Sequence, residues 1–525
     1  MVDEDGRPNN GAGPELKKNK NRIINWNMPP AICIASGTAI SYYLLYNIFF
    51  TYNRFLPALF FFILIFLISV LRVIAFGNFF YSEKDIQVLA KKINLSLISF
   101  SIGLVLGLPA RTLLPAGPDI PLPAGQVTGL QGILGDDPRA FNDGRGTGSL
   151  KINSAAGAGG LRVSAGGNVT VFFPAETIPG LKEFGRGAEI FIEGIFITGG
   201  RGTTFRASRV YVLNPASASE QFRTGFRSGV LEKFGILQNA AAPAWAGLAS
   251  AMLLGIRDNL DSDMAASFRN AGCSHVLSLS GLNLAILTGF MAFFLKRLLG
   301  LRAASLAGAV FIIVYVFLAG AQPSLVRSAI IYLLGTLSLW GFLNKNPLTL
   351  LALAFILQLY IQGESGITVS FILSYTALAG ILVTGNSVNE LLRGKIPDFI
   401  LTGLSASIGA FIMTAGVTVY YFGELHPVGL LAAILVMPLA SLFMLVSFIS
   451  LILISIIPAI FVIPDFILTV IYRFLELLVS LAGKAPGIET KSYIPVVIIS
   501  LSLAASVEIL KLLKRRGRVI ESFET

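Results

Sequence analysis

The sequence has very few of the side chains that build metal centres and disulfide frameworks. Its 525 residues include two histidines, His275 and His426, and two cysteines, Cys33 and Cys273, which form no CxxC pair. A structural zinc site needs about four such ligands, usually in closely spaced pairs. We therefore expect no metal centre and no cofactor.

Charged residues are also scarce. They make up 13% of the chain, whereas 54% of the residues are hydrophobic. Many apolar runs reach the ~20 residues that cross a bilayer, which predicts a polytopic α-helical membrane protein. The net charge of +11 does not identify a ligand, because much of it flanks apolar runs, where basic residues orient the chain. The sequence also lacks a nucleophile–base pair and a glycine-rich phosphate loop, so we expect a protein that is not an enzyme.

The first part of the chain predicts a cytoplasmic leader followed by three transmembrane helices. The leader is expected at residues 1–29, of which 1–22 are polar and include Lys17, Lys18, Lys20 and Arg22. Within 30–114, apolar segments lie near 30–50, 55–76 and 93–114, and the basic loop "EKDIQVLAKK" separates the second from the third. Basic loops favour the cytoplasmic side, so three crossings place the next segment outside the membrane.

Residues 115–235 predict a small exported β domain of barrel type. The segment is rich in Gly, Pro and charge, and it contains the short alternating runs "NVTVFFP", "AEIFIEGIFI" and "TFRASRVYVL". Eleven basic and nine acidic residues between 116 and 230 are too balanced to indicate a nucleic-acid surface. A stripe of Arg201, Arg206 and Arg209 with Phe205 and Tyr211 is the alternative to a purely structural domain.

Residues 236–513 return to apolar composition, and 514–525 form a basic cytoplasmic tail. The stretch 243–263 is too short for a secure span, and we expect it in the membrane interface. Nine spans are predicted, which brings the total to about twelve with both termini cytoplasmic. A helix break is expected at Pro438 or Pro458. The nine lie near 275–297, 303–320, 325–343, 347–362, 366–385, 399–422, 428–457, 461–482 and 493–513.

Polar residues gather in three of these apolar blocks. Such residues either line a transport path or hold neighbouring helices together, and the sequence alone does not decide between these two roles. Gly281 lets a second backbone approach closely or lets the helix break, and Arg327 is either a pore residue or an anchor that snorkels to the interface. The candidates for pore or gating residues are His275, Ser278, Ser280, Gly281, Asn283, Gln322, Ser324, Arg327, Ser370 and Ser374.

Four blocks in fixed order carry a resemblance to a known family. They are "MLLGIRDNLDSDMAASFRNAGCSHVLSLSGLNLAIL" (252–287), "AQPSLVRSAIIYLL" (321–334), "SFILSYTALAGIL" (370–382) and "VYYFGELHPVGLLAAILVMPL" (419–439). Together they resemble the ComEC family of competence channel proteins. The resemblance implies that the exported domain is of OB type. It also implies a bacterial inner-membrane channel that carries single-stranded DNA into the cytoplasm during natural transformation.

The sequence departs from this family at two places. Asn283 stands where the family commonly has histidine, so a titrating group is not expected there. Two histidines cannot build the His-rich metal motif of the C-terminal metallo-β-lactamase-like domain that many members carry. We therefore expect a member without that domain, whose incoming strand is degraded by another protein.

The resemblance also implies ligands and partners. The expected DNA contacts are Arg201, Phe205, Arg206, Arg209, Arg257 and Arg269. Expected partners are single-stranded DNA, membrane lipid, a DNA receptor, a separate nuclease, and a cytoplasmic motor or single-stranded-DNA-binding protein. The competing hypothesis is a transporter or flippase that uses the same fold for another polar or anionic substrate.

Overall fold

The computed structural model describes residues 30–49, 99–103 and 118–524, except 142–143, 158–159, 200–201, 237–241, 280, 344–345 and 491. The expected leader 1–29 and the expected span near 55–76 lie outside these residues. The chain divides into two compact units, Met1–Thr112 with Asn346–Ile356, and Leu113–Lys345 with Leu357–Thr525. In the first unit, α2 (Pro30–Phe49) matches the first expected span, and Gly103 lies against the Ile34 backbone, where a Cβ would not fit.

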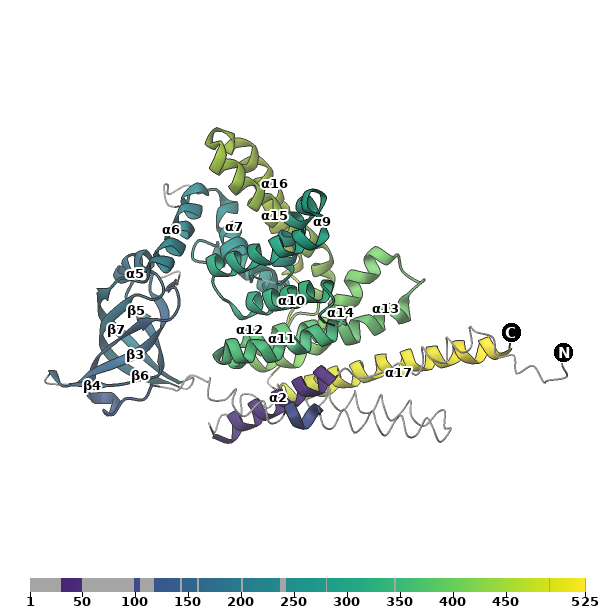
Figure 1. Cartoon of the computed structure of the whole chain (residues 1–525), viewed down its shortest axis with the longest axis horizontal. Helices are drawn as coiled ribbons and strands as arrows, with labels where there is room; N and C mark the ends of the chain where they lie inside the picture. The colour runs from purple at the N-terminus through teal and green to yellow at the C-terminus, as the bar shows by residue number, and fades with distance from the viewer. Residues whose placement is uncertain are drawn as a thin grey trace. The chain divides into compact units, whose positions relative to one another are not determined.

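Five strands of the second unit pair in a closed ring. The strands are β1 (Val127–Leu134), β3 (Gly146–Gly157), β5 (Asn168–Phe173), β6 (Glu189–Gly199) and β7 (Gly202–Asn214). They follow the order β1–β3–β5–β7–β6 and return to β1 (Figure 1). All these pairs are antiparallel except β5–β7. The short strands β2 (Arg139–Ala140) and β4 (Arg162–Ser164) pair antiparallel with β3. The three alternating runs of the sequence form β5, β6 and β7.

The ring encloses an apolar core, which corrects one predicted DNA contact. Alternate residues of a strand point to opposite faces, so Phe205 and Ala207 of β7 lie inside while Arg206 lies outside. Phe205 is completely buried, and its ring packs edge-on against Phe196 with centroids 5.0 Å apart. A side chain in the core cannot stack on a base, so the prediction for Phe205 was wrong.

Helix α5 (Ile178–Phe184) lies between β5 and β6, and three further helices follow the last strand of the ring. They are α6 (Ala218–Lys233), α7 (Ala244–Leu254) and α8 (Ser262–Asn270), whose first turn is capped by the Asp261 carboxylate. Ten of the eleven side chains of α7 are buried among other parts of this unit. An interfacial helix keeps one polar face in water, so the expected interfacial position of this segment was wrong.

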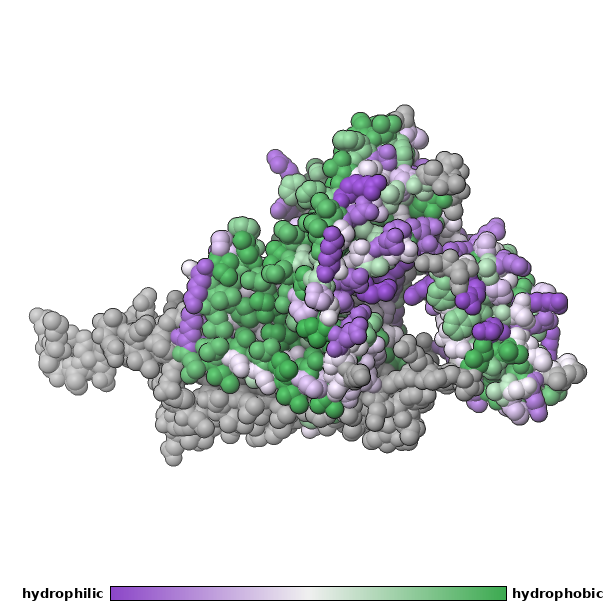
Figure 2. Space-filling model, turned by 180° about the vertical axis from the view of Figure 1, so that it is seen from behind, coloured by the Kyte–Doolittle hydropathy of each residue, from purple (hydrophilic) through white to green (hydrophobic). Residues whose placement is uncertain are grey.

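The remaining α-helices lie between residues 281 and 524 (Figure 1). They are α9 (Gly281–Ala319), α10 (Pro323–Leu339), α11 (Pro347–Ile361), α12 (Val369–Gly380), α13 (Asn386–Leu392), α14 (Asp398–Phe422), α15 (Gly429–Ile456), α16 (Val462–Ala482) and α17 (Ile494–Glu524). In the part of the chain that the structure describes, five segments are long and apolar enough to cross a membrane. These are Gly281–Ala319, Val369–Leu392, Asp398–Phe422, Gly429–Ile456 and Ile494–Lys511. Figure 2 shows broad apolar surface over the helices and mixed polarity over the sheet.

The helix boundaries agree with the predicted spans at two points and differ at one. Gly300, with φ of 77°, interrupts α9 and separates the two spans expected there. The first of them begins at Gly281 instead of residue 275, because 274–277 forms a 3-10 turn. Pro438 lies inside the continuous helix α15, whereas the break falls at Ile457 and the 3-10 turn that starts at Pro458.

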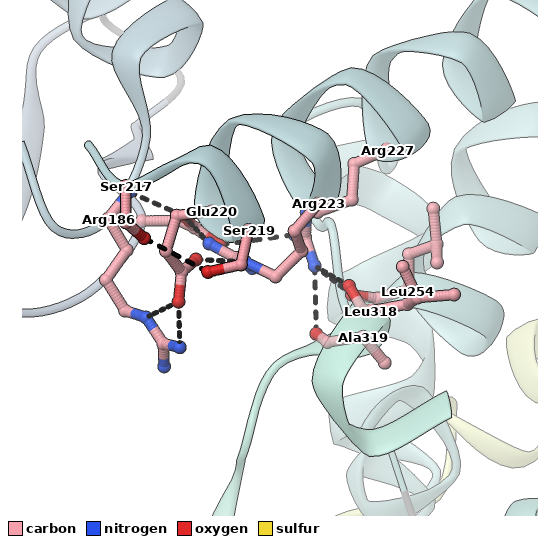
Figure 3. A network of polar contacts seen from close by, with 10 residues as sticks. Arg186, Ser217, Ser219, Glu220, Arg223, Arg227, Leu254, Leu318 and Ala319 are labelled. Atoms are coloured by element: carbon pink, nitrogen blue, oxygen red, sulfur yellow. Dashed lines mark hydrogen bonds and ion pairs between the residues drawn. The ribbon is translucent and has the colours of Figure 1, made fainter. Parts of the chain in front are cut away.

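Arginines of α6 connect the ring to the apolar helices. Arg223, only 1% exposed, holds both carboxylate oxygens of Asp137 at 2.8 and 2.5 Å and donates to Glu220 at 2.6 Å. Burial raises the pKa of Asp137, but hydrogen bonds from Arg223 and the charges of Arg227 and Arg223 outweigh it, so the pKa lies below its usual value. Arg227 Nη1 donates to the carbonyls of Leu254, Leu318 and Ala319 at 3.2, 3.3 and 2.9 Å, where α7 and α9 end (Figure 3).

Replacing Arg223 by Met should destabilise this connection by roughly 3–5 kcal/mol, because Asp137 and Glu220 would lose the cation between them. In wild type, the contribution of Asp137 to stability is present above its ordinary pKa of about 3.8 and is lost as pH falls through its lower folded value. Limited proteolysis of the detergent-solubilised protein should show faster cleavage between the ring and α7. The control is Arg209→Met, since Arg209 is exposed and lies 3.9 Å from Glu193. Equal cleavage of the two variants would contradict the role of Arg223.

Candidate functional site

The start of α10 is joined to the segment that leads into α9. Ser324 Oγ donates a hydrogen bond of 2.6 Å to the Leu279 carbonyl, and both residues are buried. Pro323 occupies the first turn of α10, where its missing N–H is not needed. Two of the polar blocks, "SLSGLN" and "AQPSLVR", therefore meet although about 40 residues separate them.

Gly281 makes this contact close. A Cβ at Gly281 would overlap Ser328 Oγ and would lie 3.2 Å from Arg327 Nη2. Ser328 is held in place by its own hydrogen bond to the Ser324 carbonyl at 2.9 Å. The first turn of α9, whose N–H groups give a helix start partial positive charge, thus lies beside the Arg327 guanidinium.

Arg327 is buried inside the apolar bundle. Its side chain is 8% exposed, and its guanidinium carbon lies 5.7 Å from the centre of the Tyr375 ring on α12. Among the described residues, no hydrogen-bond acceptor reaches its buried Nε and Nη1 atoms. Among the residues that the structure describes, no carboxylate forms an ion pair with it. A snorkelling anchor would place these atoms at the surface, so the burial favours a functional role.

Buried amides support the ring that faces Arg327. Tyr375 Oη donates to Gln358 Oε1 at 2.9 Å, and Gln358 Nε2 donates to the Pro323 carbonyl at 2.8 Å. Gln362 Nε2 donates to the Ala321 carbonyl at 3.0 Å. These bonds join the end of α11 and α12 to the start of α10 and fix the Tyr375 ring. The sequence reasoning missed Gln358, although a single amide inside the apolar run "ALAFILQLYI" is a detectable signal.

A model of the competence protein family matches residues 252–515, about half of the chain, and this stretch contains Arg327, Gly281, Gln358 and Tyr375. The chain belongs to the competence protein family. It is also similar to ComE operon protein 3 of Bacillus subtilis (strain 168), with 26% identity over 204 residues. The match covers 37% of this chain and 25% of that relative, so the chain spans a quarter of the relative's length. The family and the apolar helices together indicate a membrane protein and confirm the sequence-based recognition.

The other candidates for pore residues lie at several separate positions within the matched region 252–515. Asn283 is buried in the first turn of α9, and Gln322 is half-buried directly before α10. His275 and Ser278 lie before α9, where Ser278 Oγ donates to the His275 carbonyl at 2.6 Å. Ser370 is exposed and Ser374 half-buried, whereas Tyr375 is the α12 residue that reaches Arg327. Ser280 lies outside the described residues.

The expected DNA contacts, apart from Phe205, are dispersed. Arg206 and Arg209 are exposed on β7, and Arg269 is exposed at the end of α8. Arg257 is exposed too, but its Nη2 donates to the Leu277 carbonyl at 3.1 Å, in the turn that leads towards Gly281. Arg201 lies outside the described residues. The remaining arginines therefore do not form one cluster.

Replacing Gly281 by Ala should separate α9 from α10, because the added methyl group overlaps Ser328. Overpacking of this kind costs about 1–3 kcal/mol. Gly289 lies in the same helix with nothing within 4 Å of a Cβ, so Gly289→Ala should be neutral or stabilise by about 0.5–1 kcal/mol. Thermal unfolding in detergent provides the comparison. If both variants unfold at the wild-type temperature, the close contact at Gly281 does not contribute to stability.

Proposed function

We propose that this protein carries single-stranded DNA through the bacterial inner membrane during natural transformation, and that Arg327 contacts its phosphates. The observation that supports it most directly is the buried Arg327 guanidinium, whose Nε and Nη1 atoms have no acceptor in the described part of the chain; it lies inside the region matched by the competence family. Donors without acceptors in an apolar bundle favour an acceptor-only ligand, and phosphate oxygens are such acceptors.

The physics of the substrate supports this proposal. A polyanion cannot cross hydrocarbon, so its path needs small polar groups and few cations, since a strongly basic pore would retain it. The described bundle places one buried guanidinium beside Gly281, Ser324 and Ser328. Membership of the competence family favours DNA over other anions.

We further propose that the ring at 118–214 is an exported barrel of OB type that guides the strand. The proposal is supported by the strand pairing. Counted along the chain, the third and fifth strands of the ring, β5 and β7, are parallel, and α5 lies between the third and the fourth. OB barrels bind oligonucleotides on their surface by stacking and charge. The described surface offers Tyr211, 45% exposed and stacked on Phe191, whose ring also faces Arg162 at 5.8 Å.

The proposed topology has about twelve spans with both termini cytoplasmic, residues 115–235 exported, and a channel domain at 236–513. Besides the five long segments, the shorter apolar helices at Ala31–Tyr43, Pro323–Leu339 and Pro347–Ile361 lie at expected spans and support a larger number of crossings. We propose transport without catalysis, so that a DNA receptor, a nuclease and a motor or single-stranded-DNA-binding protein act as separate partners.

Arg327→Gln should lower DNA uptake at least tenfold, because glutamine cannot offer the charged, forked donor set to phosphate. The measurement is the number of transformants in a strain whose own copy is deleted, at equal membrane levels of the variant. The control, Arg473→Gln, removes an exposed arginine paired with Glu476 and should transform normally. Normal transformation by Arg327→Gln would show that Arg327 is not needed for DNA uptake and has only a structural role. Uptake of a small organic phosphate, but not DNA, by the purified protein would favour the alternative transporter.

The proposed topology predicts from which side of the membrane a reagent can label each of two introduced cysteines. Asn153→Cys on β3 should react with an impermeant maleimide from outside, whereas Lys395→Cys, after α13, should react only after permeabilisation. Both positions are exposed, and the natural cysteines Cys33 and Cys273 are buried, so background labelling should be low. Labelling of Lys395→Cys alone in intact cells would invert the topology.

A further inference from the structure

A second buried polar cluster lies far from Arg327, where α13 meets α17. Ser387 of α13 is completely buried, and Glu508 and Lys511 of α17 are 6% and 9% exposed. Ser387 Oγ lies 2.6 Å from Glu508 Oε1 and 3.0 Å from Lys511 Nζ. Lys511 Nζ also lies 3.7 Å from Glu390 Oε2. Ionisable groups buried among apolar spans are costly, and they commonly mark proton or ion sites.

The hydroxyl of Ser387 has two acceptors in reach and one proton to donate. One acceptor is Glu508 Oε1, and the other is the Val383 carbonyl at 3.0 Å. Lys511 donates to the hydroxyl oxygen in either case. An ionised Glu508 accepts the hydroxyl proton, whereas a protonated Glu508 can donate to the hydroxyl oxygen, which frees the hydroxyl proton for Val383. Both arrangements satisfy every atom of the hydroxyl.

Val383 belongs to an unusual backbone segment. Residues Ile381–Gly385 form a π-helical turn between α12 and α13. Gly409 of α14 lies so close to Gly380 and Gly385 that a Cβ would overlap both. Such turns are rare and occur frequently at functional sites, because the helix can change its hydrogen bonding there.

We infer that Glu508, Ser387 and Lys511 form a proton-binding site, and that the bound proton changes the hydrogen bonding of the π turn through Ser387. On binding, one proton adds to the Glu508 carboxylate, and the hydroxyl proton turns from Glu508 to the Val383 carbonyl. Among the described residues, the charged groups at the site include Glu390 from α13 and Lys511 and Lys514 from α17 itself. The π turn has no ionisable residue, and α14 has none between Phe399 and Val419.

The site bears on transport because α12, the π turn and α13 form one candidate span, Val369–Leu392. Tyr375, which faces Arg327, and Ser387 lie twelve positions apart in it, roughly 18 Å along a helix. This consequence rests on the proposed function, since proton binding at one end of the span would reach the phosphate contact at the other. The proton-binding site itself does not depend on any transported substrate.

Infrared spectroscopy of the full chain in lipid vesicles tests the site directly. On acidification from about pH 8 to about pH 5, the wild type should gain a band of a protonated buried carboxyl, and Glu508→Gln should lose that band. Glu476→Gln is the matched control, because Glu476 is an exposed glutamate of α16 paired with Arg473, and it should keep the band. In Ser387→Ala, which keeps Glu508, the band should remain and shift in frequency. An unchanged band in Glu508→Gln would overturn the inference.

Hydrogen exchange tests the link to the π turn. After correction for the intrinsic pH dependence, exchange of the amides from Val383 to Ser387 should differ at least threefold between the two pH values in wild type. The difference should vanish in Glu508→Gln and persist in Glu476→Gln. A pH difference that survives Glu508→Gln would refute the coupling. Neither measurement uses DNA, so both stand if the uptake experiment with Arg327→Gln fails, and their failure leaves that experiment intact.

Discussion

A buried guanidinium is costly unless its N–H groups find acceptors, and Arg223, Arg227 and Arg327 meet this constraint in different ways. Arg223 finds the carboxylates of Asp137 and Glu220, and Arg227 finds three backbone carbonyls at the ends of α7 and α9. Arg327 faces the Tyr375 ring, and its Nε and Nη1 atoms have no acceptor among the residues that the structure describes. A cation–π contact satisfies no N–H group, which is the basis for proposing a ligand at this arginine.

The surroundings of Arg327 show how a membrane protein keeps such a group available. Gly281 and Ser328 let α9 and α10 approach closely, and Ser324 joins α10 to the Leu279 carbonyl. Gln358 and Tyr375 use their own hydrogen bonds on each other and on the Pro323 carbonyl, so they hold the ring without occupying the guanidinium. The site is therefore rigid on its packed side and open in its hydrogen bonding, which is the arrangement that binding without reorganisation requires.

Periodicity and spacing predicted the parts of this structure that depend on local sequence. Alternation in "NVTVFFP" and "AEIFIEGIFI" gave strands at β5 and β6, and apolar length gave α14 and α15. The predictions were wrong or incomplete where tertiary contacts determine whether a residue is buried and what it contacts. Alternation defines two faces of β7 but does not show which one lines the core, so Phe205 was misplaced. Length made α7 a candidate for the interface, whereas contacts with other helices bury it. Gln358 was missed because its partners, Tyr375 and Pro323, are distant in sequence.

The candidate span Val369–Leu392 connects the two polar sites of the bundle. Its first half carries Tyr375 against Arg327, and its second half carries Ser387 against Glu508 and Lys511. A regular helix would transmit a change at one end as a rigid rod, whereas a π turn lets the two halves rotate relative to each other. The contact of Gly409 with Gly380 and Gly385 leaves no room for side chains at that turn, so α14 restrains the halves where they meet. In the coupling that we infer, a change in hydrogen bonding at Val383 would act along the helix, towards Tyr375, rather than outward.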